Sequence, residues 1–116
     1  MSITESIGVA REIDLSLYPE GTEIDNAGRL MIGGCSVAEV AGQYGTPAYL
    51  IDEAALRAQA RRYRESFESR HPNSLVLFAS KSFPSASVIG LIAEEGCGTD
   101  VASAGELMIA RAGGAD

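Results

Sequence analysis

Short apolar runs alternate with helical patterns along the chain after residue 46, and no other feature constrains the fold as strongly. The runs lie at residues 47–51, 75–79 and 99–102, and a segment with helical periodicity follows each of them. The order β-α-β-α-β-α predicts parallel strands joined by right-handed crossovers. The sequence therefore predicts an α/β fold, which begins either a doubly wound sheet or a (β/α)₈ barrel.

Start and stop signals bound the predicted helices. Asp52 is a good N-cap, and apolar residues then recur at helical spacing over about four turns. These residues are Leu56, Ala60, Tyr63 and Phe67. A second helix follows Pro84 and ends at Gly96, and a third begins with the capping box Ser103 to Glu106. The capping box explains Glu106 structurally, and we prefer that explanation to a catalytic role.

The N-terminal part of the chain has a different character. Roughly the first 25 residues are polar and interrupted by proline and glycine, which is typical of an arm or loop. A short strand is expected at 29–32, followed by a short helix that Ser36 caps and Gly45 ends. We therefore expect two parts, an arm at residues 1–45 and an α/β part at residues 46–116.

The α/β part is too short to be a complete barrel. A (β/α)₈ barrel needs about 250 residues, so the chain can hold only the opening units. The last predicted strand, at 99–102, has no parallel neighbour on its far side, and an exposed edge of a buried-type strand is a poor place for a domain to stop. We expect the chain to be a fragment of a longer protein.

Charge and cysteine content narrow the classes of function. A net charge of −7 argues against a nucleic-acid-binding protein and against docking on an anionic membrane. No apolar stretch approaches the ~20 residues of a membrane span. Cys35 and Cys97 lie far apart, and with one histidine they do not form a zinc motif, so no metal site is expected. Two lone cysteines without a secretory signal favour the cytoplasm.

Lys81 is the strongest candidate for a chemical role, and it is the only lysine of the chain. It follows the apolar run 75–79, and functional groups of parallel α/β folds gather at the C-terminal ends of strands. Between Ser80 and Ser82 it would be partly desolvated, which would lower the pKa of its amine and favour a Schiff base with a carbonyl compound. Position alone favours an ordinary surface lysine.

Other candidates are weaker. Asp100, in the next strand, could balance the charge of an amine or orient a cofactor, or it could be an ordinary strand-end carboxylate. His71 precedes a proline in a polar turn and is expected to be solvated. The glycine pairs match neither a P-loop nor a dinucleotide-binding fingerprint.

Four stretches, in order and at the right spacing, resemble one known family. They are Gly-Arg-Leu-Met-Ile-Gly-Gly at 28–34, Tyr-Gly-Thr-Pro-Ala-Tyr-Leu-Ile-Asp at 44–52, Phe-Ala-Ser-Lys at 78–81 and Gly-Thr-Asp-Val-Ala-Ser-Ala-Gly-Glu-Leu at 98–107. Residues 28–116 thereby resemble the N-terminal part of diaminopimelate decarboxylases. These belong to the fold type III pyridoxal-phosphate enzymes, which are built on an alanine-racemase-like barrel.

The resemblance implies a fold, a cofactor and two site residues. The fold would be a (β/α)₈ barrel with a β-domain to which the N-terminal segment contributes. Lys81 would be the Schiff-base lysine of pyridoxal 5′-phosphate, and Asp100 would lie close to the cofactor. The reaction would be decarboxylation of an amino acid, most simply meso-2,6-diaminopimelate to L-lysine, in a homodimer. The phosphate-binding and substrate-binding residues would lie beyond residue 116, so the fragment should be inactive alone.

Some alternatives stay open at this point. Relatives often have Lys-Ala where this chain has Lys81-Ser82, and Ala104 replaces a common glycine. These departures leave ornithine, arginine or a specialised-metabolism amino acid as possible substrates. A racemase fits the N-terminal pattern less well than a decarboxylase does. A non-catalytic relative that binds a partner decarboxylase is also consistent with the fragment.

Overall fold

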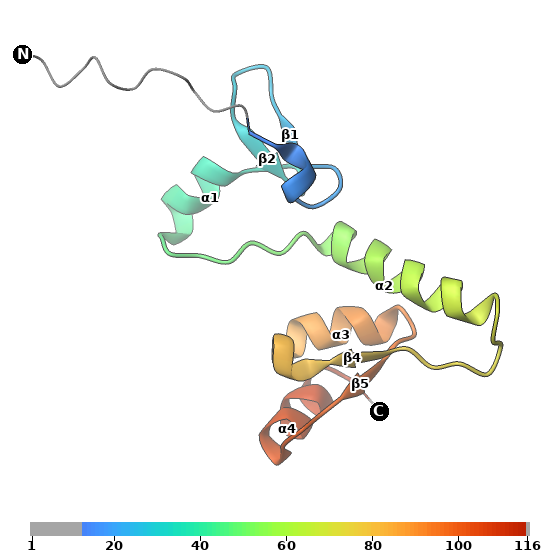
Figure 1. The fold of residues 1–116 in the computed structure, drawn as a ribbon. Coiled ribbons are helices and arrows are strands. Elements are labelled where there is room, and N and C mark those ends of the chain that lie inside the picture. The colour runs from blue at the N-terminus through green and yellow to red at the C-terminus, as the bar shows by residue number, and fades with distance from the viewer. Residues whose placement is uncertain (1–12, 116) are drawn as a thin grey trace, which may run out of the picture. The chain divides into compact units, whose positions relative to one another are not determined.

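The computed structural model describes residues 13–115 and divides them into two compact units, with the boundary between Ala48 and Tyr49 (Figure 1). Each unit is described by itself. Among these residues, none of the helices has the length and apolar character needed to span a bilayer.

The first unit contains a small antiparallel sheet and one helix. After the 3₁₀ turn Leu15–Leu17, strands β1 (Glu23–Ile24), β2 (Leu30–Ile32) and β3 (Cys35–Ser36) pair in the order β1-β2-β3. Helix α1 (Val37–Tyr44) follows. The strand predicted at 29–32 and the short helix are confirmed, whereas β1 and β3 were not predicted. Strands of two residues carry no hydrophobic period that a sequence could reveal.

The local signals at both ends of α1 act as predicted. The Ser36 hydroxyl accepts a hydrogen bond from the backbone N–H of Glu39, so Ser36 is the N-cap. Gly45 follows the helix at a φ of 83°, a left-handed conformation that glycine adopts without strain. The beginning of the predicted N-terminal arm, residues 1–12, lies outside the described residues.

The second unit contains the parallel strands. Its elements are α2 (Glu53–Glu68), β4 (Leu77–Ala79), the 3₁₀ turn Ser80–Ser82, α3 (Ala86–Glu94), β5 (Gly98–Asp100) and α4 (Ala104–Ala112). Strands β4 and β5 pair in parallel, with Ala79 opposite Asp100. This confirms the predicted strand-helix-strand crossover, in which α3 connects two adjacent parallel strands.

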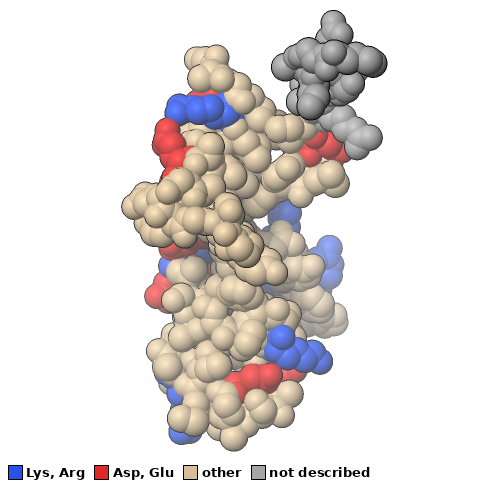
Figure 2. Space-filling model, turned by 90° about the vertical axis from the view of Figure 1, so that its left-hand side faces the viewer, with Lys and Arg blue, Asp and Glu red and all other residues tan. Residues whose placement is uncertain are grey.

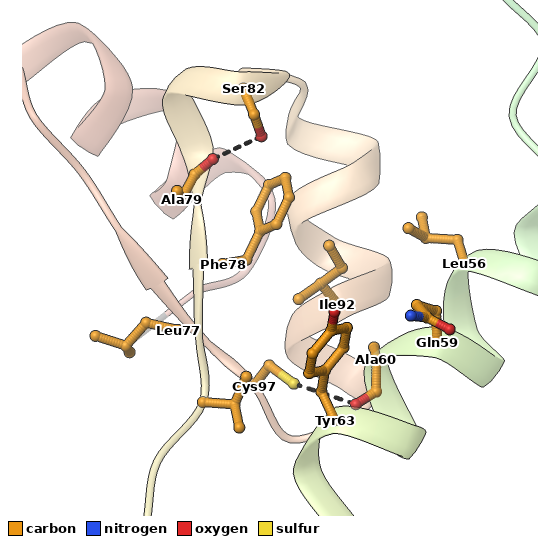
Figure 3. Close-up of a pocket in the computed structure, with 11 residues that line it drawn as sticks. Leu56, Gln59, Ala60, Tyr63, Leu77, Phe78, Ala79, Ser82, Ile92 and Cys97 are labelled. Atoms are coloured by element: carbon orange, nitrogen blue, oxygen red, sulfur yellow. Dashed lines mark hydrogen bonds between the residues drawn. The ribbon is translucent and has the colours of Figure 1, made fainter.

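Two sequence-based expectations about strands were wrong. Residues 47–51 form no strand, and Tyr49 is 94% exposed. A strand is stabilised by pairing, and nothing within residues 13–115 pairs with this apolar run. The run 75–79 has no polar alternation, which is typical of a strand covered on both faces, yet Leu77 is 55% exposed. Figure 3 shows Leu77 and Phe78 on opposite sides of β4, and only Phe78 points toward α2 and α3.

The core of the second unit lies between its helices and the parallel strands. Val88, Ile92 and Cys97 are buried, and partly buried apolar side chains of α2 and β4 pack against them. Ile89 is fully buried. Helix α2 is also joined to α3 by ion pairs of Arg57 and Arg61 with Glu94 and Glu95. Acidic and basic side chains lie in small neighbouring groups on the face shown in Figure 2.

Helices α3 and α4 approach each other closely at two glycines. A Cβ atom added to Gly90 would lie 2.7 Å from the carbonyl oxygen of Gly113, and one added to Gly113 would collide with the carbonyl oxygen of Ala86. Neither position has room for a side chain. This contact holds the C-terminal end of α4 against α3.

Candidate functional site

Lys81 lies immediately after the C-terminal end of β4, in the 3₁₀ turn Ser80–Ser82. The backbone N–H of Phe83 donates to the carbonyl of Ser80 (3.0 Å), and the Ser82 hydroxyl donates to the carbonyl of Ala79 (2.8 Å; Figure 3). These bonds close the turn on both sides of Lys81. The strand-end position predicted for the lysine is therefore confirmed.

The side chain of Lys81 is exposed, which contradicts the expected partial desolvation. Ser82 and Phe83, which follow Lys81, are exposed as well. Within residues 13–115, the Lys81 amine makes no hydrogen bond or ion pair.

Asp100 ends β5, the strand next to β4. It is the register partner of Ala79, which precedes Lys81 by two residues, so both candidates lie at the same C-terminal edge of the parallel pair. The side chain of Asp100 is exposed and, among the described residues, makes no hydrogen bond or ion pair. The predicted juxtaposition of the two strand ends is confirmed, and neither side chain has a partner within the part of the chain that the structure describes.

Glu106 makes contacts that the capping-box interpretation did not include. The Ser103 hydroxyl accepts a hydrogen bond from the Glu106 backbone N–H (3.2 Å), as a capping box predicts. The Glu106 carboxylate, however, accepts from the backbone N–H of Ala102 (2.6 Å) and from the hydroxyl of Ser80 (3.4 Å). Ser80 precedes Glu106 by 26 residues, so no local pattern could have revealed this contact.

The other candidates from the sequence do not join this site. His71 is exposed in the turn after α2, and Cys35 is exposed in the first unit. Cys97 is buried in the core, where burial raises the pKa of its thiol. Across residues 13–115, there is no group of three or more His, Cys, Asp or Glu side chains that could hold a metal ion.

An apolar pocket of about 380 Å³ lies between α2 and β4 (Figure 3). Tyr63, Phe78 and Ile92 line it together with neighbouring apolar residues, and the lining contains no Lys, Arg, His, Asp or Glu side chain. Charged ligands such as amino acids or phosphates would find no counter-charge there. The edge that carries Lys81 and Asp100 is therefore the better candidate for a site.

Comparison with known proteins shows which family the chain resembles. Residues 53–116 match the family described as pyridoxal-dependent decarboxylase, pyridoxal binding domain. The chain is 44% identical over 93 residues to a diaminopimelate decarboxylase of Synechocystis, covering 79% of this chain. It is 40% identical over 111 residues to that of Actinosynnema pretiosum, covering 94% of this chain.

A solved structure resembles the fold as well. The crystal structure of diaminopimelate decarboxylase from M. jannaschii in complex with L-lysine matches with a TM-score of 0.73 and 32% identity, over 83% of this chain. The chain spans 20% to 24% of the length of these three relatives. Its β4-α3-β5-α4 arrangement is accordingly the opening part of a (β/α)₈ barrel. From the family match over residues 53–116, the chain belongs to the pyridoxal-dependent decarboxylases.

Proposed function

We propose that this chain is the N-terminal part of a pyridoxal-phosphate-dependent enzyme that decarboxylates meso-2,6-diaminopimelate to L-lysine. One observation carries the proposal: the only lysine of the chain lies at the C-terminal end of strand β4, and its amine has no partner within residues 13–115. Catalytic groups of barrel enzymes lie at this end of the strands.

The residues at this edge fit the cofactor. Pyridoxal phosphate, when bound, supplies an aldehyde that condenses with an amine and a ring that takes up the electron pair left by decarboxylation. Lys81 would provide the amine, because it is exposed and no group among the described residues competes for it. Asp100 would provide a negative charge on the neighbouring strand end, which favours the approach of a cationic group.

The relatives support the choice of substrate. Both of the relatives described above are named diaminopimelate decarboxylases, and the solved relative was crystallised with L-lysine, which would be the product of the proposed reaction. Decarboxylases of ornithine, arginine or a specialised-metabolism amino acid are the alternatives that a substrate screen has to separate.

The proposal also covers the domains, the oligomeric state and the location of the complete enzyme. Residues 1–45 would contribute to the β-domain of the complete enzyme, and residues 46–116 would begin its barrel. The complete enzyme would act as a homodimer in the cytoplasm, where the two free cysteines of the chain would stay reduced.

Covalent trapping tests the role of Lys81. The chain is incubated with pyridoxal phosphate, reduced with borohydride and mapped by peptide mass spectrometry. The adduct should lie on Lys81 and should be absent from Lys81→Arg, which keeps the positive charge. The α-amino group is the internal control for nonspecific reaction. Modification confined to the α-amino group would contradict the proposed role.

A chimera tests whether this chain supports decarboxylation. This chain replaces the matching residues of the Actinosynnema enzyme, of which it covers 24%. Release of carbon dioxide from meso-diaminopimelate is expected, and no turnover would favour a non-catalytic relative.

The full-length protein tests the substrate, because it carries its own substrate-binding residues. Release of carbon dioxide is measured with meso-diaminopimelate, ornithine and arginine. Turnover of meso-diaminopimelate alone is expected, and turnover of another amino acid instead would overturn the substrate assignment.

A further inference from the structure

One carboxylate oxygen connects the two loops that carry the proposed site residues. Oε2 of Glu106 accepts hydrogen bonds from the hydroxyl of Ser80 and from the backbone N–H of Ala102. Ser80 directly precedes Lys81, and Ala102 lies two residues after Asp100. Glu106 itself lies in the first turn of α4. The contact therefore joins the end of β4, the loop after β5 and the start of α4.

Burial makes this contact costly to break. Ser80 is completely buried, and Glu106 is its hydrogen-bond acceptor. A buried hydroxyl that loses its acceptor cannot hydrogen-bond to water instead. The 3₁₀ turn would therefore have to rearrange to give the Ser80 hydroxyl a new partner. The preceding residue, Ala79, is held by pairing with Asp100, so rearrangement would fall on Ser80 and Lys81.

Capping alone does not account for the direction of the Glu106 side chain. In a capping box the carboxylate returns to the backbone N–H of the N-cap residue, which is Ser103 here. The carboxylate instead reaches one residue further, to Ala102, and across to Ser80 on a different strand end. The helix start would need only the Ser103 hydroxyl, which is in place.

We propose that Glu106 is a positioning residue for Lys81, acting through the buried hydroxyl of Ser80 to fix the turn on which the reactive amine stands. The inference rests on the proposed function in assigning Lys81 its role, but the geometry of the turn can be tested without it. Because a single oxygen accepts both hydrogen bonds, the carbonyl oxygen of a glutamine can replace it. The positioning role therefore requires an acceptor and does not require a charge.

The unique lysine makes the first test direct. In the chain labelled with ¹⁵N-lysine, the backbone of Lys81 gives the single labelled amide signal. Glu106→Ala should shift and broaden this signal, although the substituted residue lies 25 positions after Lys81 in the sequence. Glu106→Gln should leave the signal close to that of the unsubstituted chain. Equal effects of Ala and Gln would mean that charge matters and would overturn the proposal.

A double-mutant comparison tests the route through Ser80. Ser80→Ala will itself shift the neighbouring Lys81 signal, so the informative quantity is the additional effect of Glu106→Ala in that background. No additional shift is expected, because the hydroxyl that Glu106 holds is already gone. Additive shifts from the two substitutions would show that Glu106 acts by another route and would contradict the proposal.

Ser103→Ala is the matched control for helix capping. It removes the N-cap of α4 and leaves both acceptor contacts of Glu106 available. The Lys81 signal should be unchanged in this variant even where α4 is less stable. A shift equal to that of Glu106→Ala would reduce the role of Glu106 to stabilising α4.

Cofactor attachment provides the second readout. Borohydride-trapped modification of Lys81 by pyridoxal phosphate should be about fivefold slower in Glu106→Ala, the effect expected from losing the hydrogen bond that fixes Ser80, and nearly unchanged in Glu106→Gln and Ser103→Ala. Failure of the unsubstituted chain to be modified at Lys81 would refute the proposed function. Modification at equal rates in all four chains would refute the positioning role alone.

Discussion

At the scale of single residues, the two cysteines show how burial controls chemistry. Cys35 is exposed, whereas Cys97 is 7% exposed and packs in the core of the second unit. The thiolate is the reactive form, and burial raises the pKa of the Cys97 thiol. The two thiols should therefore differ in reactivity although neither belongs to the proposed site.

Alkylation at neutral pH tests this difference. Iodoacetamide should modify Cys35 in the folded chain and leave Cys97 protected until urea unfolds the chain, as followed by peptide mass spectrometry. Cys35→Ser, in which Cys97 is the remaining thiol, is the control. The raised folded-state pKa also gives a pH dependence: the contribution of the protonated Cys97 thiol to stability is complete below the ordinary pKa of 9.0, and it is lost as pH rises through the folded-state pKa. Equal labelling of both thiols in the folded chain would contradict the buried position.

At the scale of elements, glycine allows two helices to meet. Gly90→Ala should lower the free energy of unfolding by about 1–3 kcal/mol, because the new methyl group would collide with the carbonyl oxygen of Gly113. Gly42→Ala, in helix α1, is the matched control, since nothing lies within 4 Å of its added Cβ. This control should raise stability by about 0.5–1 kcal/mol. Urea unfolding followed by circular dichroism measures both, and a stabilising Gly90→Ala would refute the close contact.

The ion pairs between α2 and α3 predict a pH dependence. Burial alone would raise the pKa of Glu95, but hydrogen bonds from Arg57 and Arg61 outweigh it and lower the pKa below the ordinary 4.5. A lowered folded-state pKa means that the stabilisation is complete above 4.5 and is lost as pH falls through the folded-state value. Glu95→Gln should therefore lower the melting temperature at neutral pH. In acid, the difference in melting temperature between this variant and the unsubstituted chain should disappear.

Glu94→Gln provides the control for this pair of helices. Its carboxylate is 66% exposed and, among the described residues, bonds to one arginine, Arg57, whereas that of Glu95 is 12% exposed and bonds to two arginines. Thermal unfolding by circular dichroism should show a smaller loss for Glu94→Gln than for Glu95→Gln. The ion-pair network would be contradicted if both variants lost the same melting temperature, or if the difference between Glu95→Gln and the unsubstituted chain were as large at acid pH as at neutral pH.

At the scale of the whole molecule, the exposure of the site decides what the chain can do by itself. Lys81 and Asp100 are both exposed, and water at such a site weakens every electrostatic interaction on which catalysis depends. We expect the chain alone to release no carbon dioxide from meso-diaminopimelate in the presence of pyridoxal phosphate. The chimera described above is the positive control, and turnover by the chain that Lys81→Arg abolishes would refute this expectation.

Much of the second unit was predictable because its signals are local. Asp52 and Ser103 accept the capping hydrogen bonds assigned to them, and Gly96 ends α3 at a φ of 80°. The run 47–51 misled the prediction because apolar composition alone does not supply a pairing partner. The exposure of Leu77 was missed for the same reason, since it depends on which segments cover β4.

Local signals were enough to predict the order of α2, β4, α3, β5 and α4, the parallel arrangement of the two strands and the place of Lys81 at a strand end. Each of these follows from hydrophobic period, caps and glycines, which act over a few residues. Only the tertiary structure decided that the Lys81 amine is exposed and that Glu106 reaches Ser80 across the two strand ends. Burial and side-chain contacts between distant segments depend on how complete elements pack, and no short stretch of sequence encodes them.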